Sequence, residues 1–187
     1  MKTLHIYQGI QGSGKSTSAR QFVLEDPDNR IRVNRDEIRL MIGKPFNPKM
    51  ENLVTQIENA ALVAAFKTGK DVISDNMNLN SRIRRNLEKM AQRYQYDVEY
   101  HFVYTPLEVC IERDSKRQYP VGEKVIRETY TKYKDYVEEH NPENERIQEK
   151  KKKSKMIDNL TFKEISFRGM YTLGVNNPDK LYFTSDT

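Results

Sequence analysis

The feature that most constrains this chain of 187 residues is a glycine-rich segment near its beginning, Gly9–Ser16, with the sequence Gly-Ile-Gln-Gly-Ser-Gly-Lys-Ser. It matches the pattern G-x-x-x-x-G-K-[ST], in which glycines let the backbone curl so that its N–H groups point at a phosphate. An apolar strand pattern, Thr3–Gln8, precedes the segment, and a helical pattern follows it. The positive end of that helix would face the same phosphate. The segment therefore predicts a nucleoside-triphosphate site rather than a chance match in a flexible turn.

The roles within this phosphate loop follow from the chemistry of its side chains. Lys15 can neutralise the β- and γ-phosphates, and the Ser16 hydroxyl can ligate Mg²⁺. ATP and Mg²⁺ are thus the expected phosphate donor and metal. The residues expected to contact the nucleotide in this loop are Gly9, Gln11, Gly12, Ser13, Gly14, Lys15, Ser16 and Thr17.

Short apolar runs alternate with longer helical patterns along residues 1–140, which is typical of an α/β fold with a central parallel sheet flanked by helices. Strands are expected at Thr3–Gln8, Ile31–Asn34, Asp71–Asp75 and Val98–Tyr104. Helices are expected at about Lys15–Leu24, Asp36–Ile42, Pro48–Thr68, Ser81–Tyr94, from Thr105-Pro106 toward Arg117, and at Glu123–Glu139. In the last helix Tyr130, Tyr133 and Tyr136 favour a packing stripe over a base-stacking platform.

Residues 141–187 are expected to form a basic linker and a small C-terminal extension, either separate from the domain at 1–140 or packed on it. The linker contains the lysine run Lys150–Lys153, which favours a solvated surface. Leu160–Phe167 and Leu181–Ser185 have strand character, which leaves open a fifth strand or a small hairpin.

Composition excludes some classes of protein without choosing the function. No apolar run approaches the roughly 18 residues of a membrane span, and the N-terminus turns polar too early for a signal peptide. The single cysteine, Cys110, excludes an internal disulfide framework and fits a reducing cytoplasm. The net charge of +5, with 32% charged residues and a mean hydropathy of -0.86, permits an anionic partner but does not identify one.

Acidic residues after two of the strands are candidates for the chemistry beside the phosphate loop. Asp75 ends one strand, where it could face the phosphates or act as a turn residue. Asp36 and Arg39 share one face at the start of a helix, so a carboxylate could accept a proton while the arginine holds a phosphate. The spacing alone favours the simpler interpretation, an aspartate that caps the helix and a surface arginine.

A basic cluster, Arg113–Arg117, follows the fourth strand and precedes a break that contains Pro120 and Gly122. This arrangement suggests a helical lid, because an inserted arginine stabilises the charge that spreads over a phosphoryl group during transfer. The alternative is a basic surface at a helix end, where positive charge offsets the helix dipole.

Four short motifs occur in order along residues 1–140: Gly12–Thr17, Asn34–Asp36 with Arg39, Ser74-Asp75 with Asn78–Asn80, and Arg113–Arg117. This ordered set resembles that of phage-type 5′-polynucleotide kinases. The resemblance implies a P-loop kinase domain and an ATP-dependent transfer of phosphate to the 5′-hydroxyl end of DNA or RNA. The spacing from Asp75 to Asn78–Asn80 is one residue longer than in the family pattern.

The resemblance also implies residue roles. Lys15 and Ser16 would handle the phosphates and Mg²⁺, and Asp36 would be the general base. Arg39 would contact the acceptor's phosphate, Asp75 would be an acidic residue on the acceptor side, and Arg117, with Arg113 as a second candidate, would contact the donor phosphates.

Phage enzymes of this kind often continue into a phosphatase domain that opens with Asp-x-Asp-Gly-Thr, a motif that this sequence lacks. We therefore expect kinase activity without 3′-phosphatase activity. Two alternatives stay open: a P-loop kinase for a small hydroxyl metabolite or nucleoside, and a nucleotide-gated nucleic-acid-binding module. The oligomeric state stays undetermined.

Overall fold

The computed structural model describes residues 2–43, 46–144 and 146. The chain divides into two compact units, Met1–Asn141 and Pro142–Thr187. The features described below belong to the first unit. The lysine run and the two C-terminal strand patterns lie outside the described residues.

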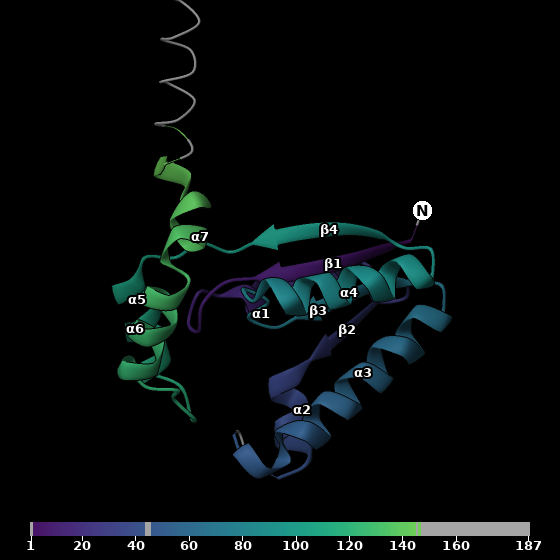
Figure 1. Cartoon of the computed structure of the whole chain (residues 1–187), viewed down its shortest axis with the longest axis horizontal. Coiled ribbons are helices and arrows are strands. Elements are labelled where there is room, and N and C mark those ends of the chain that lie inside the picture. The colour runs from purple at the N-terminus through teal and green to yellow at the C-terminus, as the bar shows by residue number, and fades with distance from the viewer. Residues whose placement is uncertain (1, 44–45, 145, 147–187) are drawn as a thin grey trace, which may run out of the picture. The chain divides into compact units, whose positions relative to one another are not determined.

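Four parallel strands form the centre of the first unit (Figure 1). They are β1 (Thr3–Gln8), β2 (Arg30–Asn34), β3 (Asp71–Asp75) and β4 (Asp97–Phe102), in the order β2-β3-β1-β4. The central strand β1 pairs with β3 on one side and β4 on the other. This arrangement confirms the expected parallel sheet, although β4 ends two residues earlier than its apolar pattern indicated.

The helices are α1 (Lys15–Glu25), α2 (Arg35–Met41), α3 (Glu51–Lys67), α4 (Ser81–Arg93), α5 (Leu107–Ser115), α6 (Glu123–Lys132) and α7 (Lys134–Glu139), with a 3₁₀ turn, η1, at Pro48–Met50. Two expected helices are divided. Pro48 starts η1 rather than α3, because Asn47 caps a single tight turn there. The helix expected over Glu123–Glu139 is interrupted at Tyr133, whose φ of -117° and ψ of 20° leave the helical region.

Alternate residues of the sheet face two different helix layers. Leu4, Ile6 and Val72 pack with Leu62 and Phe66 of α3 and with α4. Tyr7 and Ile73, on the opposite face, pack with Ala19 and Phe22 of α1. The phosphate loop between β1 and α1 is therefore anchored by a strand and a helix that are both part of the core.

A third apolar cluster joins the phosphate loop to α5, α6 and α7. Its buried members are Ile10, Leu79, Cys110, Ile126 and Val137. Tyr130, Tyr133 and Tyr136 pack against this cluster, so the expected tyrosine stripe is confirmed as a packing feature. Within the described residues, no helix is long and apolar enough to cross a bilayer.

Asn78 joins the ends of β1 and β3. Its backbone has a φ of +46°, and its side-chain amide donates to the carbonyl oxygens of Tyr7 (2.9 Å) and Ser74 (3.2 Å). The side-chain amide of Gln8 in turn donates to the carbonyl oxygen of Asn78 (3.1 Å). All of these groups are buried, so the turn after β3 is fixed relative to the phosphate loop by polar contacts.

We expect Asn78→Ala to lower the free energy of unfolding by about 3 kcal/mol, because it leaves buried carbonyls unpaired and puts alanine in the left-handed region. Asn80→Ala is the matched control. Asn80 caps α4 at a partly exposed position, and its loss should cost only about 1 kcal/mol. Urea unfolding of both variants measures the difference, and equal losses would contradict this role of Asn78.

Candidate functional site

The phosphate loop requires glycine at positions that approach other backbone closely. A Cβ atom at Gly12, where φ is +81°, would lie only 2.2 Å from the carbonyl oxygen of Cys110. Gly14 has a φ of +94° and immediately precedes α1. The loop therefore curls tightly between β1 and α1 while α5 packs against its back.

Lys15 and Ser16 begin α1. The Lys15 Nζ atom donates to the carbonyl oxygen of Ile10 (3.3 Å), which folds the side chain back over the loop. The Ser16 hydroxyl donates to Asp75 Oδ1 (3.0 Å). Thr17 lies in the lining of a cavity of about 600 Å³ beside α1, which Gly14 and Arg113 also line.

Asp75 at the end of β3 is completely buried, yet its carboxylate is fully engaged. Besides Ser16, Arg32 donates to its Oδ2 atom through Nε (2.8 Å), and Asn34 donates to the same oxygen (3.0 Å). A buried ion with this many donors is stable because charge-assisted hydrogen bonds replace the lost water. Asp75 therefore joins the ends of β2 and β3 to the first turn of α1.

Asn34 also defines the start of α2. Its Oδ1 atom accepts from the backbone N–H of Glu37 (2.9 Å), as the cap of the helix, while its amide holds Asp75. The next residues on the helix, Arg35 and Asp36, are thereby placed at a fixed position at the end of the sheet.

Asp36 and Arg39 lie on one face of α2, as their spacing predicted, and they form an ion pair, whereas the helix cap is Asn34 and not Asp36. Arg39 Nη1 donates to Asp36 Oδ1 (2.6 Å), and the remaining edge of the guanidinium binds both oxygens of Glu51 on α3 (2.9 and 2.8 Å). The hydrogen bonds from Arg39, and further ones from Arg35, lower the pKa of Glu51 to about 2. The side chain of Asp36 itself is 69% exposed, so its carboxylate is held by one partner and open to a ligand.

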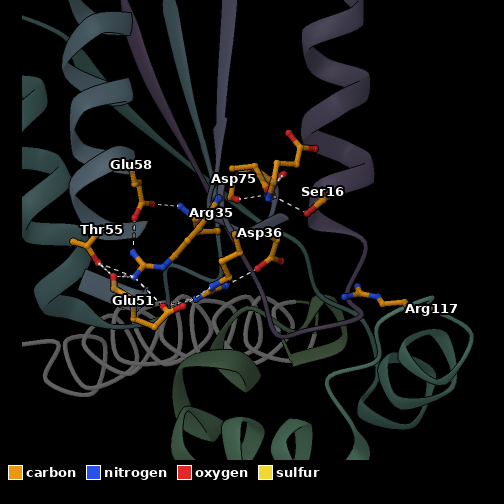
Figure 2. A network of polar contacts seen from close by, with 12 residues as sticks. Ser16, Arg35, Asp36, Glu51, Thr55, Glu58, Asp75 and Arg117 are labelled. Atoms are coloured by element: carbon orange, nitrogen blue, oxygen red, sulfur yellow. Dashed lines mark hydrogen bonds and ion pairs between the residues drawn. The ribbon is translucent and has the colours of Figure 1, made fainter. Parts of the chain in front are cut away.

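A second arginine, Arg35, connects α2 to α3. Arg35 donates to Glu58 (2.5 Å), Glu51 (3.1 Å) and Thr55 (2.7 Å), all on α3. Asn76, which follows β3, links the same set, because its oxygen accepts from the backbone N–H of Arg35 (2.9 Å) and its amide donates to Glu58 (2.6 Å). Figure 2 shows this network between α2, α3 and the end of β3.

Two arginines reach the loop region from α5 and the turn after it. Arg113 lies at the phosphate loop, where its Nη1 atom donates to the carbonyl oxygen of Ser13 (3.4 Å). Arg117 pairs with Asp114 (3.6 Å) and stays 42% exposed. Asp114 is buried and accepts from the backbone N–H of Gly122 (2.9 Å), which closes the turn that carries Arg117.

These groups border one region in front of the phosphate loop. In Figure 2 the Asp36 carboxylate and the Arg117 guanidinium point toward one another, and Ser16 lies at the start of α1 beside them. Burial lowers the pKa of Lys15. The charges of Asp75 and Asp36 raise that pKa, and the charge of Arg117 lowers it. The arrangement can hold a polyphosphate on one side and present a carboxylate on the other.

The structure thus brings together residues from all four motifs, and it adds partners that the motifs did not include. Arg32, Glu51 and Glu58 hold the proposed catalytic groups but were not singled out in the sequence. For Glu51 the sequence offers no signal, because it lies on another helix, 12 residues after Arg39. Asn34 and Arg35 precede Asp36 in the motif Asn-Arg-Asp, and this position beside Asp36 is the sequence feature that could have identified them as site residues.

Comparison with known proteins places these observations in a family. The model of the family described as AAA domain matches residues 4–140. A protein of Autographa californica nuclear polyhedrosis virus, provisionally named a bifunctional polynucleotide kinase/RNA ligase, is 26% identical over 149 residues, which are 71% of this chain and 21% of that protein. This chain therefore spans about a fifth of that relative's length.

Solved structures show the same likeness. A chain in a structure of the Pnkp1/Rnl/Hen1 RNA repair complex aligns with a TM-score of 0.63 and 31% identity over 75% of this chain and 46% of that one. A chain in a second structure of the Pnkp1/Rnl/Hen1 complex aligns with a TM-score of 0.54 and 32% identity, over 64% of this chain and 42% of that one. These matches confirm the P-loop kinase fold and the family resemblance that the motifs indicated.

The contact between Gly12 and Cys110 gives a test of the phosphate loop. We expect Gly12→Ala to weaken ATP binding at least about tenfold, or about 1.4 kcal/mol, because the new Cβ atom meets a backbone carbonyl and displaces the loop. Gly69→Ala is the control. Its φ of +76° is nearly the same, but its Cβ would meet only the flexible end of Lys2. Calorimetric titration with ATP measures both, and equal affinities would contradict the expected loop distortion.

The Glu51 network predicts a pH dependence of stability. The folded-state pKa of about 2 lies below the usual 4.5, so the stabilisation is complete above about pH 4.5 and is lost as the pH falls toward 2. We expect Glu51→Gln to cost about 2 kcal/mol at pH 7 and progressively less below pH 4. Urea unfolding across this range measures the effect. Glu112→Gln, which breaks an exposed pair with Lys116, should change little at any pH, and a similar loss there would refute the assignment.

Proposed function

We propose that this chain, which belongs to the AAA domain family, is a kinase that transfers the γ-phosphate of ATP to the 5′-hydroxyl end of DNA or RNA. The observation that carries the proposal is the placement of the Asp36 carboxylate across from Arg117, beside the phosphate loop that carries Lys15 and Ser16. The names of the relatives supply the class of acceptor, since those proteins are described as a polynucleotide kinase and as parts of an RNA repair complex.

On the donor side, Lys15 and the backbone N–H groups of the loop bind the β- and γ-phosphates. The Ser16 hydroxyl is a hard oxygen donor of the kind that suits Mg²⁺, and it donates its proton to Asp75 Oδ1 at 3.0 Å. Bound there, Mg²⁺ would neutralise charge on the phosphate oxygens. Asp75 keeps the Ser16 hydroxyl in place through its own bonds to Arg32 and Asn34.

On the acceptor side, Asp36 takes the proton of the attacking hydroxyl. The new bond joins the 5′ oxygen to the γ-phosphorus, the bond from that phosphorus to the β,γ-bridging oxygen breaks, and ADP leaves. Arg39 fixes the orientation of Asp36 through the 2.6 Å hydrogen bond, while Glu51 fixes Arg39. The protein thus contributes positioning and charge rather than a covalent intermediate.

Arg117 supplies positive charge where the transferred phosphoryl group would pass. Because its only ion pair among the described residues is the 3.6 Å contact with Asp114, its guanidinium can reorient toward a phosphate at little cost. Arg113 is committed to the carbonyl oxygen of Ser13 and serves the loop itself. We therefore assign the charge stabilisation during transfer to Arg117 and a positioning role to Arg113.

The decisive experiment transfers radiolabelled γ-phosphate from ATP to a panel of acceptors, namely 5′-hydroxyl DNA, 5′-hydroxyl RNA, a nucleoside, a 3′-mononucleotide and simple sugars. We expect label on the oligonucleotides, with affinity that falls steeply as salt rises because several phosphates are contacted. Label on a nucleoside or sugar alone would identify a small-molecule kinase. Binding of oligonucleotides with no transfer to any acceptor would identify a binding module.

Asp36→Asn tests the proposed base. We expect transfer to fall at least about 100-fold while ATP binding stays nearly unchanged, because the amide cannot accept the proton. Asp28→Asn, at an exposed turn, is the matched control and should retain full activity. If Asp36→Asn still labels the oligonucleotide at the rate of the unchanged protein, Asp36 is not the base.

A further inference from the structure

Two histidines and a glutamate meet on the face of the sheet that α1 covers. His5 lies in β1, and Glu99 and His101 lie in the neighbouring strand β4. The strand register pairs His5 with Glu99 and Tyr7 with His101. Because residues two apart in a strand point to the same face, all three side chains emerge on one side of the sheet. None of them belongs to the phosphate loop or to the network around Asp36.

The distances between their donor atoms are those of a small coordination site. His5 Nδ1 lies 2.9 Å from His101 Nε2 and 3.6 Å from a Glu99 oxygen, and His101 Nε2 lies 3.4 Å from the other Glu99 oxygen. Ligand atoms around a tetrahedral ion, each about 2.0 Å from the metal, are about 3.3 Å apart. The three groups therefore already stand at the separations that one shared ion would impose.

Asp71 directs His5 toward the cluster. The Nε2 atom of His5 faces the Asp71 carboxylate at 3.7 Å and has no hydrogen-bond partner among the described residues, although the side chain is more than nine-tenths buried. A carboxylate there favours a proton on Nε2, which leaves the lone pair of Nδ1 facing His101 and Glu99. Carboxylates commonly orient metal-binding histidines in this way.

Aromatic neighbours hold both imidazole rings. Tyr7 stacks on His101 with ring centroids 4.7 Å apart, and Phe22 of α1 contacts His5 edge-on, also at 4.7 Å. Two fixed imidazoles beside a carboxylate whose side chain is 58% exposed leave one side of the cluster open to an ion from solvent.

We propose that His5, Glu99 and His101 bind one Zn²⁺ ion and thereby attach the edge strand β4 to the central strand β1. Two imidazoles and a carboxylate select zinc and its late first-row neighbours over Mg²⁺, which prefers oxygen ligands. On binding, His101 gives up the proton on Nε2 and takes one on Nδ1 by exchange with solvent, so the ring stays neutral and its Nε2 lone pair faces the ion; water fills the fourth position. The site is independent of the kinase assignment.

The test is titration of the full-length chain with ZnCl₂, without nucleotide and with excess Mg²⁺ so that the phosphate site does not compete. We expect one Zn²⁺ per chain by native mass spectrometry and a rise in the thermal unfolding temperature on binding. Co²⁺ in place of Zn²⁺ should give the visible absorption of a tetrahedral site. A chain that takes up no Zn²⁺ under these conditions would overturn the proposal.

Variants locate the ion. His101→Gln and Glu99→Gln, both at partly exposed positions, should fold as shown by circular dichroism and lose the bound Zn²⁺ and its effect on unfolding. His140→Gln is the matched control, since His140 is the remaining histidine of the chain and stacks on Phe102 away from the cluster. Zinc binding that survives His101→Gln, or that disappears equally in His140→Gln, would place the ion elsewhere and contradict the proposal.

Discussion

The buried carboxylate of Asp75 is the interaction on which the rest of this structure depends. It is fully removed from water, and it accepts hydrogen bonds from Ser16, Arg32 and Asn34. An unpaired carboxylate at that position would be too costly to bury. The pairing therefore requires the first turn of α1, the end of β2 and the end of β3 to meet at one point, and that point is the centre of the candidate site.

From Asp75, a continuous series of hydrogen bonds leads through α2 to α3. Asn34 bonds Asp75 and caps α2, and α2 carries Asp36 and Arg39 into contact with α3. On the other side, α5 packs so closely behind Gly12 that only glycine fits there. The side chains proposed for the donor and acceptor sides are thus held by packed neighbouring elements, and rigid positioning of this kind is what phosphoryl transfer demands.

Much of this arrangement could be predicted from local patterns, and the failures lie where contacts between distant segments decide the structure. The four strands and the phosphate loop are confirmed because apolar runs and glycine spacing reflect short-range sterics. The helix over Glu123–Glu139 is interrupted at Tyr133, a residue that packs against the third apolar cluster, and the uniform helical pattern gave no sign of this break. Glu51 and Glu58 could not be identified as site residues from the sequence, because they belong to the site only through hydrogen bonds from arginines on a different helix.

The sequence by itself determined the phosphate loop, the parallel sheet and the candidates Lys15, Asp36, Arg39, Asp75, Arg113 and Arg117, because each depends on residue type and near neighbours. Only the tertiary structure decided which of these residues meet. In the folded chain the Ser16 hydroxyl donates to the Asp75 carboxylate, and Arg39 donates to Glu51. The imidazole of His5 in β1 contacts that of His101 in the neighbouring strand β4. The physical reason is that these contacts join segments far apart in the chain, and their distances are fixed only when sheet and helices pack together.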